Sequence, residues 1–287
     1  MQSLKVTKKY DKKNVSKVLF DTFPALTKNT LYKAFRQKDI KINGRRINED
    51  TLVYLDDEVQ IYVVDNLLFN TLTPNIIYED NNILVVNKPS EIEVVGANSL
   101  TSCLKSLYPH TYIEPCHRLD RNTTGLVLFA KNEKSLKILL DKFKNHEIEK
   151  HYISKVYGIP KKESQTLTAY LFKDSKKSMV YISDEPKKGY SKIITSYSTI
   201  EKNTKENYSI LDITLHTGKT HQIRAHLAHI GLPILGDGKY GNNQINKEFG
   251  YKYQQLTSSS LKFVFTTDAD ILNYLNRKEI RLYTMTR

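Results

Sequence analysis

The chain has 287 residues, 39% of them hydrophobic, and a formal net charge of +13. This length and composition suffice for one large domain and one small one, and they exclude wholesale disorder. No apolar run approaches the ~20 residues of a membrane-spanning helix, no apolar stretch follows the basic N-terminus, and two cysteines (Cys103 and Cys116) exclude a disulfide framework. We therefore expect a cytoplasmic protein with reduced thiols and neither a secretory signal nor a membrane partner.

The positive charge is concentrated at the N-terminal end. Residues 1–48 hold 13 Lys and Arg against three acids, a net of +10, so the other 239 residues carry +3. Lys and Arg bind phosphates by displacing condensed counterions, which predicts a polyanion-binding module in this segment. The alternative is a merely solubilising basic face in a Lys-rich protein.

The first segment is predicted to be a compact α/β module. Apolar residues at helical spacing from Val15 to Thr22 predict a helix that ends at Phe23-Pro24. A second helix is expected from Lys28 to about Gln37. Asn43-Gly44 between extended residues predicts a tight turn, and residues 59–64 predict a closing strand.

Residues 11–64 resemble the S4 RNA-binding domain. The resemblance lies in the segments LYKAFR (31–36), KINGR (41–45) and DEVQI (57–61). It implies that the second helix and the following turn present basic side chains to RNA. The matching positions are Lys33, Arg36, Lys38, Lys41 and Arg45. Residues 65–75 are predicted to be a linker to a second domain, residues 76–287.

The second domain shows many short strands and few helices. Strands are predicted at 83–89, 126–130, 151–158, 179–182, 190–199, 208–215 and 261–265. Asn132 is expected to cap a helix whose buried face carries Leu136, Leu139, Leu140 and Phe143. Another helix is predicted from near His221 to before Gly231, and a short one at 271–275. This pattern predicts an α+β fold with a mixed, largely antiparallel sheet.

The densest polar motif is CHRLDRNTTG (116–125), which precedes a buried strand. Asp120 lies between two arginines, and nearby positive charge favours an ionised carboxylate. A carboxylate held at the rim of a rigid strand can be a nucleophile. A loop-stabilising ion pair is the alternative, and local chemistry does not decide between them.

This motif resembles the signature of RluA-type RNA pseudouridine synthases. His117 favours that type over the sister group acting on small-subunit ribosomal RNA, which has Gly at this position. Three further segments match the family in the right order: NKPS (87–90), EKHYISKVYG (149–158) and GKTHQIRAHL (218–227). The chain departs from the family at Glu91 and Ser154, where Gly and Ala are usual. The resemblance extends over essentially the whole chain.

The resemblance implies a role for each matching residue. Asp120 would attack the target uridine, Tyr152 would stack on the uracil, and Arg224 would pair with Asp120. Arg118 would fill the space left by a uridine flipped out of an RNA helix. No cofactor or metal is implied, and a monomer suffices. The expected substrate is large-subunit (23S) ribosomal RNA, with transfer RNA as the alternative.

Two other interpretations follow from the sequence. Residues 216–229 contain four of the eight histidines, which could form a metal site, although only His226 and His229 are spaced to share a helix face. The chain could also be a non-catalytic RNA-binding or ribosome assembly factor on the same fold. The presence of Asp120, Tyr152 and Arg224 together favours the enzyme.

Overall fold

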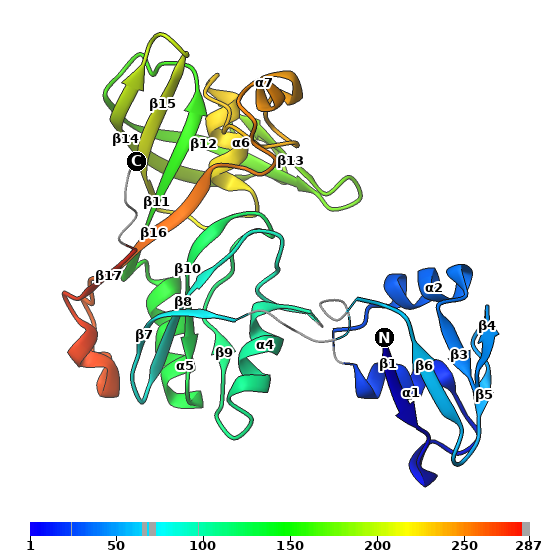
Figure 1. The fold of residues 1–287 in the computed structure, drawn as a ribbon. Helices are drawn as coiled ribbons and strands as arrows, with labels where there is room; N and C mark the ends of the chain where they lie inside the picture. The colour runs from blue at the N-terminus through cyan, green and yellow to red at the C-terminus, as the bar shows by residue number, and fades with distance from the viewer. Residues whose placement is uncertain (24, 65–67, 69–72, 97, 283–287) are drawn as a thin grey trace. The chain divides into compact units, whose positions relative to one another are not determined.

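The computed structural model describes the chain except for residues 24, 65–67, 69–72, 97 and 283–287. The described residues form two compact units. One consists of residues 1–73 and 95–107, and the other of residues 74–94 and 108–287 (Figure 1). No described helix is both long enough and apolar enough to cross a membrane.

The N-terminal unit is built on a four-stranded antiparallel sheet. Its strand order is β1 (Gln2–Lys5), β6 (Glu58–Ile61), β3 (Ile40–Ile42) and β4 (Arg45–Ile47). The helices α1 (Val15–Thr22) and α2 (Lys28–Gln37) supply apolar residues to a common core with this sheet. The remaining elements are η1 (Lys8–Tyr10), the paired strands β2 (Lys13–Asn14) and β5 (Leu52–Val53), and α4 (Leu100–Leu107).

Local signals predicted this unit well. Both helices have the predicted bounds, although Pro24 lies outside the described residues. Asn43 and Gly44 have φ of 47° and 77°, which is the left-handed pair that a tight hairpin turn requires. The closing strand is shorter than predicted and ends at Ile61. Most of the predicted linker, residues 65–67 and 69–72, lies outside the described residues.

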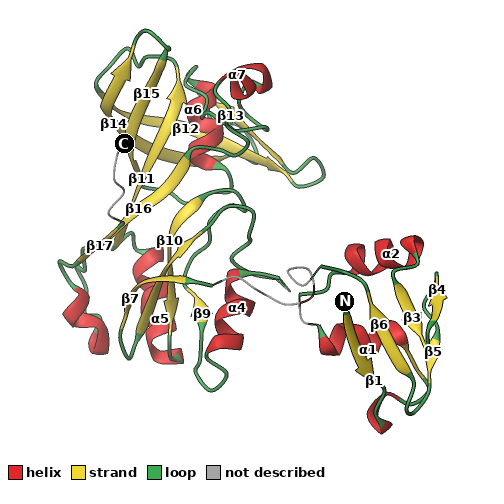
Figure 2. Cartoon of the chain, in the orientation of Figure 1, coloured by secondary structure: helices red, strands yellow, loops and turns green. Residues whose placement is uncertain are grey.

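The second unit is dominated by one large sheet (Figure 2). The order of its main path is β13 (Met179–Ser183), β12 (Ser164–Asp174), β14 (Ser191–Asn203), β15 (Tyr208–Leu215), β11 (Ile148–Tyr157), β16 (Leu256–Phe263), β10 (Thr124–Ala130), β8 (Ile83–Lys88) and β7 (Asn75–Glu79). The short strands β9 (Glu114–Pro115) and β17 (Glu279–Arg281) pair with β10 and β16. The pairing of β10 with β16 is parallel, and the other described pairings are antiparallel. The α+β expectation is therefore confirmed.

Helices are few in this unit. They are α5 (Glu133–Lys144), α6 (Gln222–His229), α7 (Asn243–Glu248) and the 3-10 helix η2 (Asp270–Leu275). The sequence interpretation did not include β7, β12 or α7. The predicted buried face of α5 is wrong at Leu140, which is 47% exposed. Ser135 and Lys142 of this helix are buried instead. The Asn132 cap is confirmed, since its side-chain oxygen accepts from the Ser135 amide at 2.8 Å.

A buried ion pair fastens α5 to the segment after β16. The Lys142 ammonium donates to Glu147 Oε2 at 2.8 Å, and both side chains are almost inaccessible. Glu147 also accepts from the amides of Thr266 and Thr267. Burial raises the pKa of the Glu147 carboxyl, but the hydrogen bonds from Lys142, Thr267 and the amides outweigh it and lower the pKa to about 2.

Glu147→Gln should therefore destabilise the protein in a pH-dependent way. The folded pKa is about 2 and the ordinary value is 4.5, so the carboxylate stabilises fully above about pH 5 and progressively less as the pH falls toward 2. At pH 7 the substitution should lower the free energy of unfolding by about 3 to 5 kcal/mol, because it leaves Lys142 buried without a counter-charge. Urea unfolding between pH 3 and 7 measures this, and the penalty should shrink toward acid pH.

Glu163→Gln is the matched control. Glu163 also pairs with a lysine, Lys202, but its side chain is 74% exposed. An exposed pair contributes at most about 1 kcal/mol, so this variant should unfold almost like the parent. Equal penalties in the two variants would contradict the role assigned to the buried pair.

Candidate active site

Asp120 lies in the loop that leads into β10, and the start of that strand is fixed by a glycine. Gly125 has φ of 106°, and a Cβ on it would lie 2.2 Å from the carbonyl oxygen of Ser258 in β16. No side chain fits at this crossing of β10 and β16, so Gly is required. Thr123, two residues before Gly125, is buried, and its hydroxyl accepts from the side-chain amide of Gln254 at 2.7 Å. The Asp120 loop is thereby tied to the segment before β16.

A buried lysine holds the same loop from the other side. The Lys88 side chain is fully buried, and its ammonium donates to the carbonyls of Pro89, Ile92 and Arg121 at 2.8, 2.8 and 2.9 Å. Burial lowers the Lys88 pKa to about 8, and the charge of Asp120 opposes that effect. Three carbonyl acceptors match the three protons of the ammonium, so the geometry favours the charged form. Lys88 therefore joins the NKPS segment to the loop of Asp120.

The carboxylate of Asp120 is oriented by Arg224, which projects from the first turn of α6. Arg224 Nη1 donates to Asp120 Oδ2 at 2.9 Å. The same guanidinium is gripped by Asp237, whose oxygens accept from Nε at 2.7 Å and from Nη2 at 2.9 Å. The Asp237 side chain is fully buried and that of Arg224 is 9% exposed, whereas Asp120 is 21% exposed. Arg224 thus links an inner acid to an outer, accessible one.

The charges of this group reinforce one another. Burial alone would raise the pKa of Asp237, but hydrogen bonding and charge attraction from Arg224 lower it overall. Burial would lower the Arg224 pKa, but the two carboxylates raise it overall. The Asp237 carboxylate also accepts from the amides of Lys239 and Tyr240 at 2.9 and 3.2 Å. Arg224 and Asp237 are therefore positioned as an ion pair.

His221 lies next to Asp120, and Tyr240 contacts His221. His221 Nε2 lies 3.9 Å from Asp120 Oδ2, and its Nδ1 lies 2.8 Å from the Tyr240 hydroxyl. That hydroxyl accepts from the amide of Val180 at 2.9 Å. His221 has φ of 52° and precedes α6 directly, which turns the chain into the helix. Burial lowers the His221 pKa and the nearby Asp120 charge opposes it.

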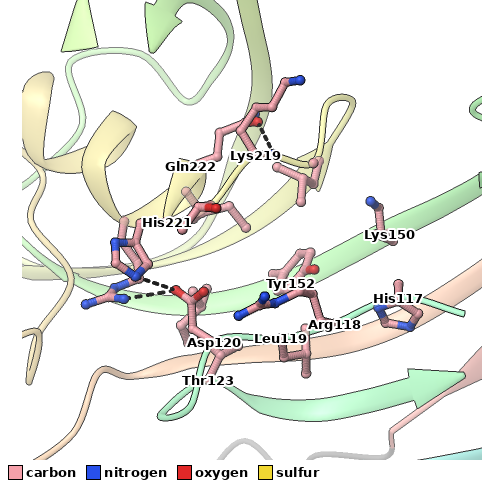
Figure 3. Close-up of a pocket in the computed structure, with 16 residues that line it drawn as sticks. His117, Arg118, Leu119, Asp120, Thr123, Lys150, Tyr152, Lys219, His221 and Gln222 are labelled. Carbon is pink, nitrogen blue, oxygen red and sulfur yellow. Dashed lines mark hydrogen bonds and ion pairs between the residues drawn. The ribbon is translucent and has the colours of Figure 1, made fainter. Parts of the chain in front are cut away.

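Asp120 opens onto a pocket of about 300 Å³. The ring of Tyr152, from β11, lies beside Asp120 in the same pocket (Figure 3). Burial raises the Tyr152 pKa, and the charge of Asp120 raises it further, so the ring is a neutral phenol. Lys150, two residues earlier on the same strand, also lines the pocket. The pocket therefore offers a carboxylate, an aromatic face and a cation.

The two arginines that flank Asp120 in sequence behave differently from Arg224. Arg118 lines the pocket and is exposed. Arg121 Nε donates to the carbonyl of Glu91 at 3.0 Å. Within the described residues, Asp120 forms its ion pairs instead with Arg224 of α6 and with His221, which are distant in sequence. A local ion pair is therefore not what orients Asp120.

The departures from the family pattern are accommodated locally. Glu91 has φ of 68°, the left-handed conformation that the usual Gly adopts freely, so the turn is kept at some cost in strain. Ser154 is buried, and its hydroxyl donates to the Gln255 carbonyl at 3.0 Å. Neither change reaches Asp120.

The four histidines of residues 216–229 do not converge. His216, His221, His226 and His229 contact Ser196, Tyr240, Thr195 and Asp184 respectively. Within the described part of the chain, no three His, Cys, Asp or Glu side chains form a group that could hold a metal ion. The one histidine of the Asp120 motif, His117, is also engaged within the protein, because its Nε2 accepts from the Leu128 amide at 3.1 Å. Burial lowers the His117 pKa to about 3.

The basic residues expected to bind RNA lie in the N-terminal unit. Lys33, Arg36, Lys38 and Arg45 are exposed, and Lys41 is half-buried with its ammonium 4.9 Å from the Tyr62 ring centroid. Lys38 ends α2 in the left-handed conformation, and its carbonyl accepts from Arg46 at 2.7 Å.

Three residues of the site were missed from sequence: Lys88, Asp237 and Tyr240. Lys88 was noted as part of a matching segment, but a lysine within an apolar strand was itself a signal for a bound partner. Asp237 and Tyr240 lie in the segment GDGKYG (236–241), whose glycines indicate close packing. A Cβ on Gly236 would lie 2.0 Å from the Tyr253 carbonyl oxygen, and its φ is 80°. The sequence contained this signal, although not the partner of Asp237.

The comparisons identify the class of protein that carries this site. Residues 82–229 match the model of the RNA pseudouridylate synthase family. The fold is also that of the human protein RNA Pseudouridylate Synthase Domain Containing 1, with a TM-score of 0.58 and 22% identity over 74% of this chain and 91% of that one. The chain belongs to the RNA pseudouridylate synthase family and is an RluA-type RNA pseudouridine synthase.

Curated relatives match over most of their length. Ribosomal large subunit pseudouridine synthase C of Buchnera aphidicola subsp. Baizongia pistaciae is 31% identical, with 91% of this chain and 88% of the relative covered. The protein of the same name from Rickettsia bellii is 32% identical, with 92% and 96% covered. The resemblance to RluA-type synthases is thereby confirmed, and the S4 resemblance of residues 11–64 stays a prediction.

Asp237→Asn should impair catalysis without preventing RNA binding. The amide can replace the hydrogen-bond acceptor of one carboxylate oxygen but not the charge, so Arg224 loses its fixed orientation toward Asp120. Misplacement of a reacting group typically costs about 100-fold. We expect kcat for uridine isomerisation to fall by about that factor with KM nearly unchanged. Asp184→Asn, which removes an exposed acid paired with His229, is the control, and an equal loss there would contradict the assignment.

Proposed function

We propose that this enzyme converts specific uridines to pseudouridine in large-subunit ribosomal RNA, with the Asp120 carboxylate as nucleophile. The observation that carries the proposal is the fixed group Asp237–Arg224–Asp120 at the edge of a pocket beside Tyr152. The relatives are named ribosomal large subunit pseudouridine synthase C, which supports ribosomal RNA as the substrate.

The reaction needs a carboxylate with a free oxygen and little else. Within the described residues, the hydrogen bond and both ion pairs of the Asp120 carboxylate involve Oδ2, which leaves Oδ1 to attack a uridine in the pocket that Asp120 lines. The Asp120 oxygen bonds to the target nucleotide, the N1–C1′ bond breaks, the uracil turns, and a C5–C1′ bond forms. The bond between Asp120 and the nucleotide then breaks, which regenerates the carboxylate. C5 loses its proton and N1 gains one, so the atoms balance without a redox step.

Tyr152 supports the turn of the base. Its neutral ring is buried at the side of the pocket, where it can stack on a uracil through each orientation. A raised pKa keeps the phenol protonated, so its oxygen could take the C5 proton only by passing on its own proton at the same time. Lys150, on the same wall of the pocket, is placed to meet a phosphate of the target nucleotide.

The target uridine must leave its RNA helix to reach Asp120. Unstacking and unpairing a base costs a few kcal/mol, and a side chain that fills the vacated space offsets part of that cost. Arg118 is exposed at the pocket and two residues from Asp120, which suits it for this role. The N-terminal unit, with the exposed basic residues of its S4-like segment 11–64, would supply additional affinity for the phosphate backbone.

Asp120→Asn tests the nucleophile. The amide keeps the shape of the side chain but is a poor nucleophile, so tritium release from RNA labelled at uridine C5 should fall to background. Affinity for the same RNA should stay within about twofold, since Asp120 is one acid at the rim of the site. Activity of the variant equal to that of the wild type would show that Asp120 is misassigned.

The choice of RNA decides the remaining alternatives. Labelled large-subunit ribosomal RNA, small-subunit ribosomal RNA and transfer RNA are compared with wild-type protein. Release from transfer RNA alone would replace the proposed substrate. No release from any of the three would contradict the proposal and favour a binding-only protein.

Neutralising the N-terminal basic residues should weaken RNA binding and flatten its salt dependence. For Lys33→Gln/Arg36→Gln/Arg45→Gln, the slope of log K against log salt should decrease by about 2 to 3, since each lost phosphate contact accounts for about 0.7 to 0.9. The triple variant Lys161→Gln/Lys162→Gln/Lys205→Gln changes the net charge equally at exposed positions of the second unit and should bind like the parent. An unchanged slope in the first variant would refute the role of the N-terminal unit.

A further inference from the structure

One end of the large sheet has a covered face and an open face. On the covered face, Leu171, Val180 and Ile193 pack with Ala225 of α6. Successive residues of a strand point to opposite faces, so Phe172 and Tyr181 belong to the other face. These two residues are direct cross-strand partners of β12 and β13, and they are 38% and 40% exposed. Figure 1 shows α6 beside β13, on the covered side.

The open face carries further aromatic rings. Tyr190 stacks on Phe172, with ring centroids 5.4 Å apart and planes inclined by 28°. Tyr170 lies two residues before Phe172 on the same strand, hence on the same face, and is half-buried. A single cross-strand aromatic pair would be explained by sheet stability alone. Three further features of this face indicate a ligand.

The first feature is charge. Residues 172–192 contain six lysines and three acids, a net of +3, which equals the net charge of all residues from 49 to 287. The lysines are Lys173, Lys176, Lys177, Lys187, Lys188 and Lys192, and all six are exposed. This short, exposed segment therefore concentrates positive charge outside residues 1–48.

The second feature is that two of the three acids are engaged within the protein. Asp174 caps the β12–β13 turn by accepting from the amides of Lys176 and Lys177 at 3.0 Å each. Asp184 pairs with His229 at 2.9 Å. By contrast, none of the six lysines forms an ion pair within the part of the chain that the structure describes. The positive charge is left for an external partner.

The third feature is the placement of charge against rings. Lys187 Nζ lies 5.9 Å from the Tyr190 ring centroid, and Lys192 is the direct partner of Tyr170 in the pairing of β14 with β12. Aromatic faces bordered by lysines are the arrangement that binds single-stranded nucleic acid, because bases stack on the rings and phosphates meet the cations. A protein partner of this face would have to be acidic and would gain less from stacked rings.

We propose that this aromatic face, formed by Tyr170, Phe172, Tyr181 and Tyr190, binds a single-stranded segment of the RNA substrate away from the target uridine. The inference rests on the proposed function, in that RNA is the substrate. It adds a second RNA contact within the catalytic unit, on the opposite face of the sheet end from α6. Such a contact would favour targets whose modified helix is flanked by an unpaired strand.

The test compares two variants with matched controls in the full-length protein, using fluorescein-labelled 20-nucleotide oligouridine as the probe. Phe172→Ala/Tyr181→Ala should weaken binding at least about tenfold, since stacking contributes about 1 to 3 kcal/mol per base. Lys187→Gln/Lys188→Gln/Lys192→Gln should decrease the salt slope by about 2. The first control is Ile200→Ala, which removes an exposed apolar side chain on β14 that is not part of the aromatic face. The second control is Lys161→Gln/Lys162→Gln/Lys205→Gln.

Cross-linking gives a direct readout that a loss of stability would not mimic. Oligouridine containing 4-thiouridine, irradiated with wild-type protein, should cross-link to peptides spanning residues 170–192. Binding equal to wild type in both variants, with no cross-link in this segment, would overturn the inference while leaving tritium release by the wild type intact. Failure of the proposed function would appear differently, as no tritium release from any RNA. A change in oligomeric state by light scattering, without a change in RNA affinity, would assign the face to contacts between copies of the chain and also overturn the inference.

Discussion

The site depends on the way one guanidinium is shared between two acids. Asp237 takes two N–H groups of Arg224 and is the more deeply buried acid, so it determines the plane and direction of the guanidinium. Asp120 then receives a hydrogen bond from the remaining nitrogen, Nη1. The inner pair therefore does the positioning, and the outer acid is the one that the proposed mechanism uses.

Local structure was predictable from the sequence because its causes are local. The bounds of α1 and α2 follow from helical spacing, the Asn132 cap from one side chain, and the 43–44 turn from two residues that tolerate positive φ. The strand β12 was missed although its buried residues alternate with more exposed ones, the two-residue period of a strand with one buried face. Leu140 was misplaced because periodicity alone does not reveal which edge of a helix the sheet covers.

The site was predictable only in part, for a similar reason. Motif resemblance named Asp120, Tyr152 and Arg224, and the structure brings all three to one pocket. It could not name Asp237, because the contact with Arg224 depends on how the segment after α6 folds back. Nor could sequence decide between neighbouring arginines and Arg224 as the partner of Asp120. Arg121, adjacent in sequence, donates to the Glu91 carbonyl, whereas Arg224, 104 residues after Asp120, donates to the Asp120 carboxylate.

The position of β16 has a consequence for how the enzyme is made. This strand lies between β10 and β11, so it joins the half of the sheet that carries the Asp120 loop to the half that carries Tyr152. On a ribosome the chain emerges from its N-terminus, so residues 256–263 appear only after both of their neighbouring strands. Until they do, the two halves lack the strand that pairs with both, and the long-range contacts of the site cannot close. The pocket that Asp120, Tyr152 and Arg224 line would thus be assembled only once the chain has been made through β16.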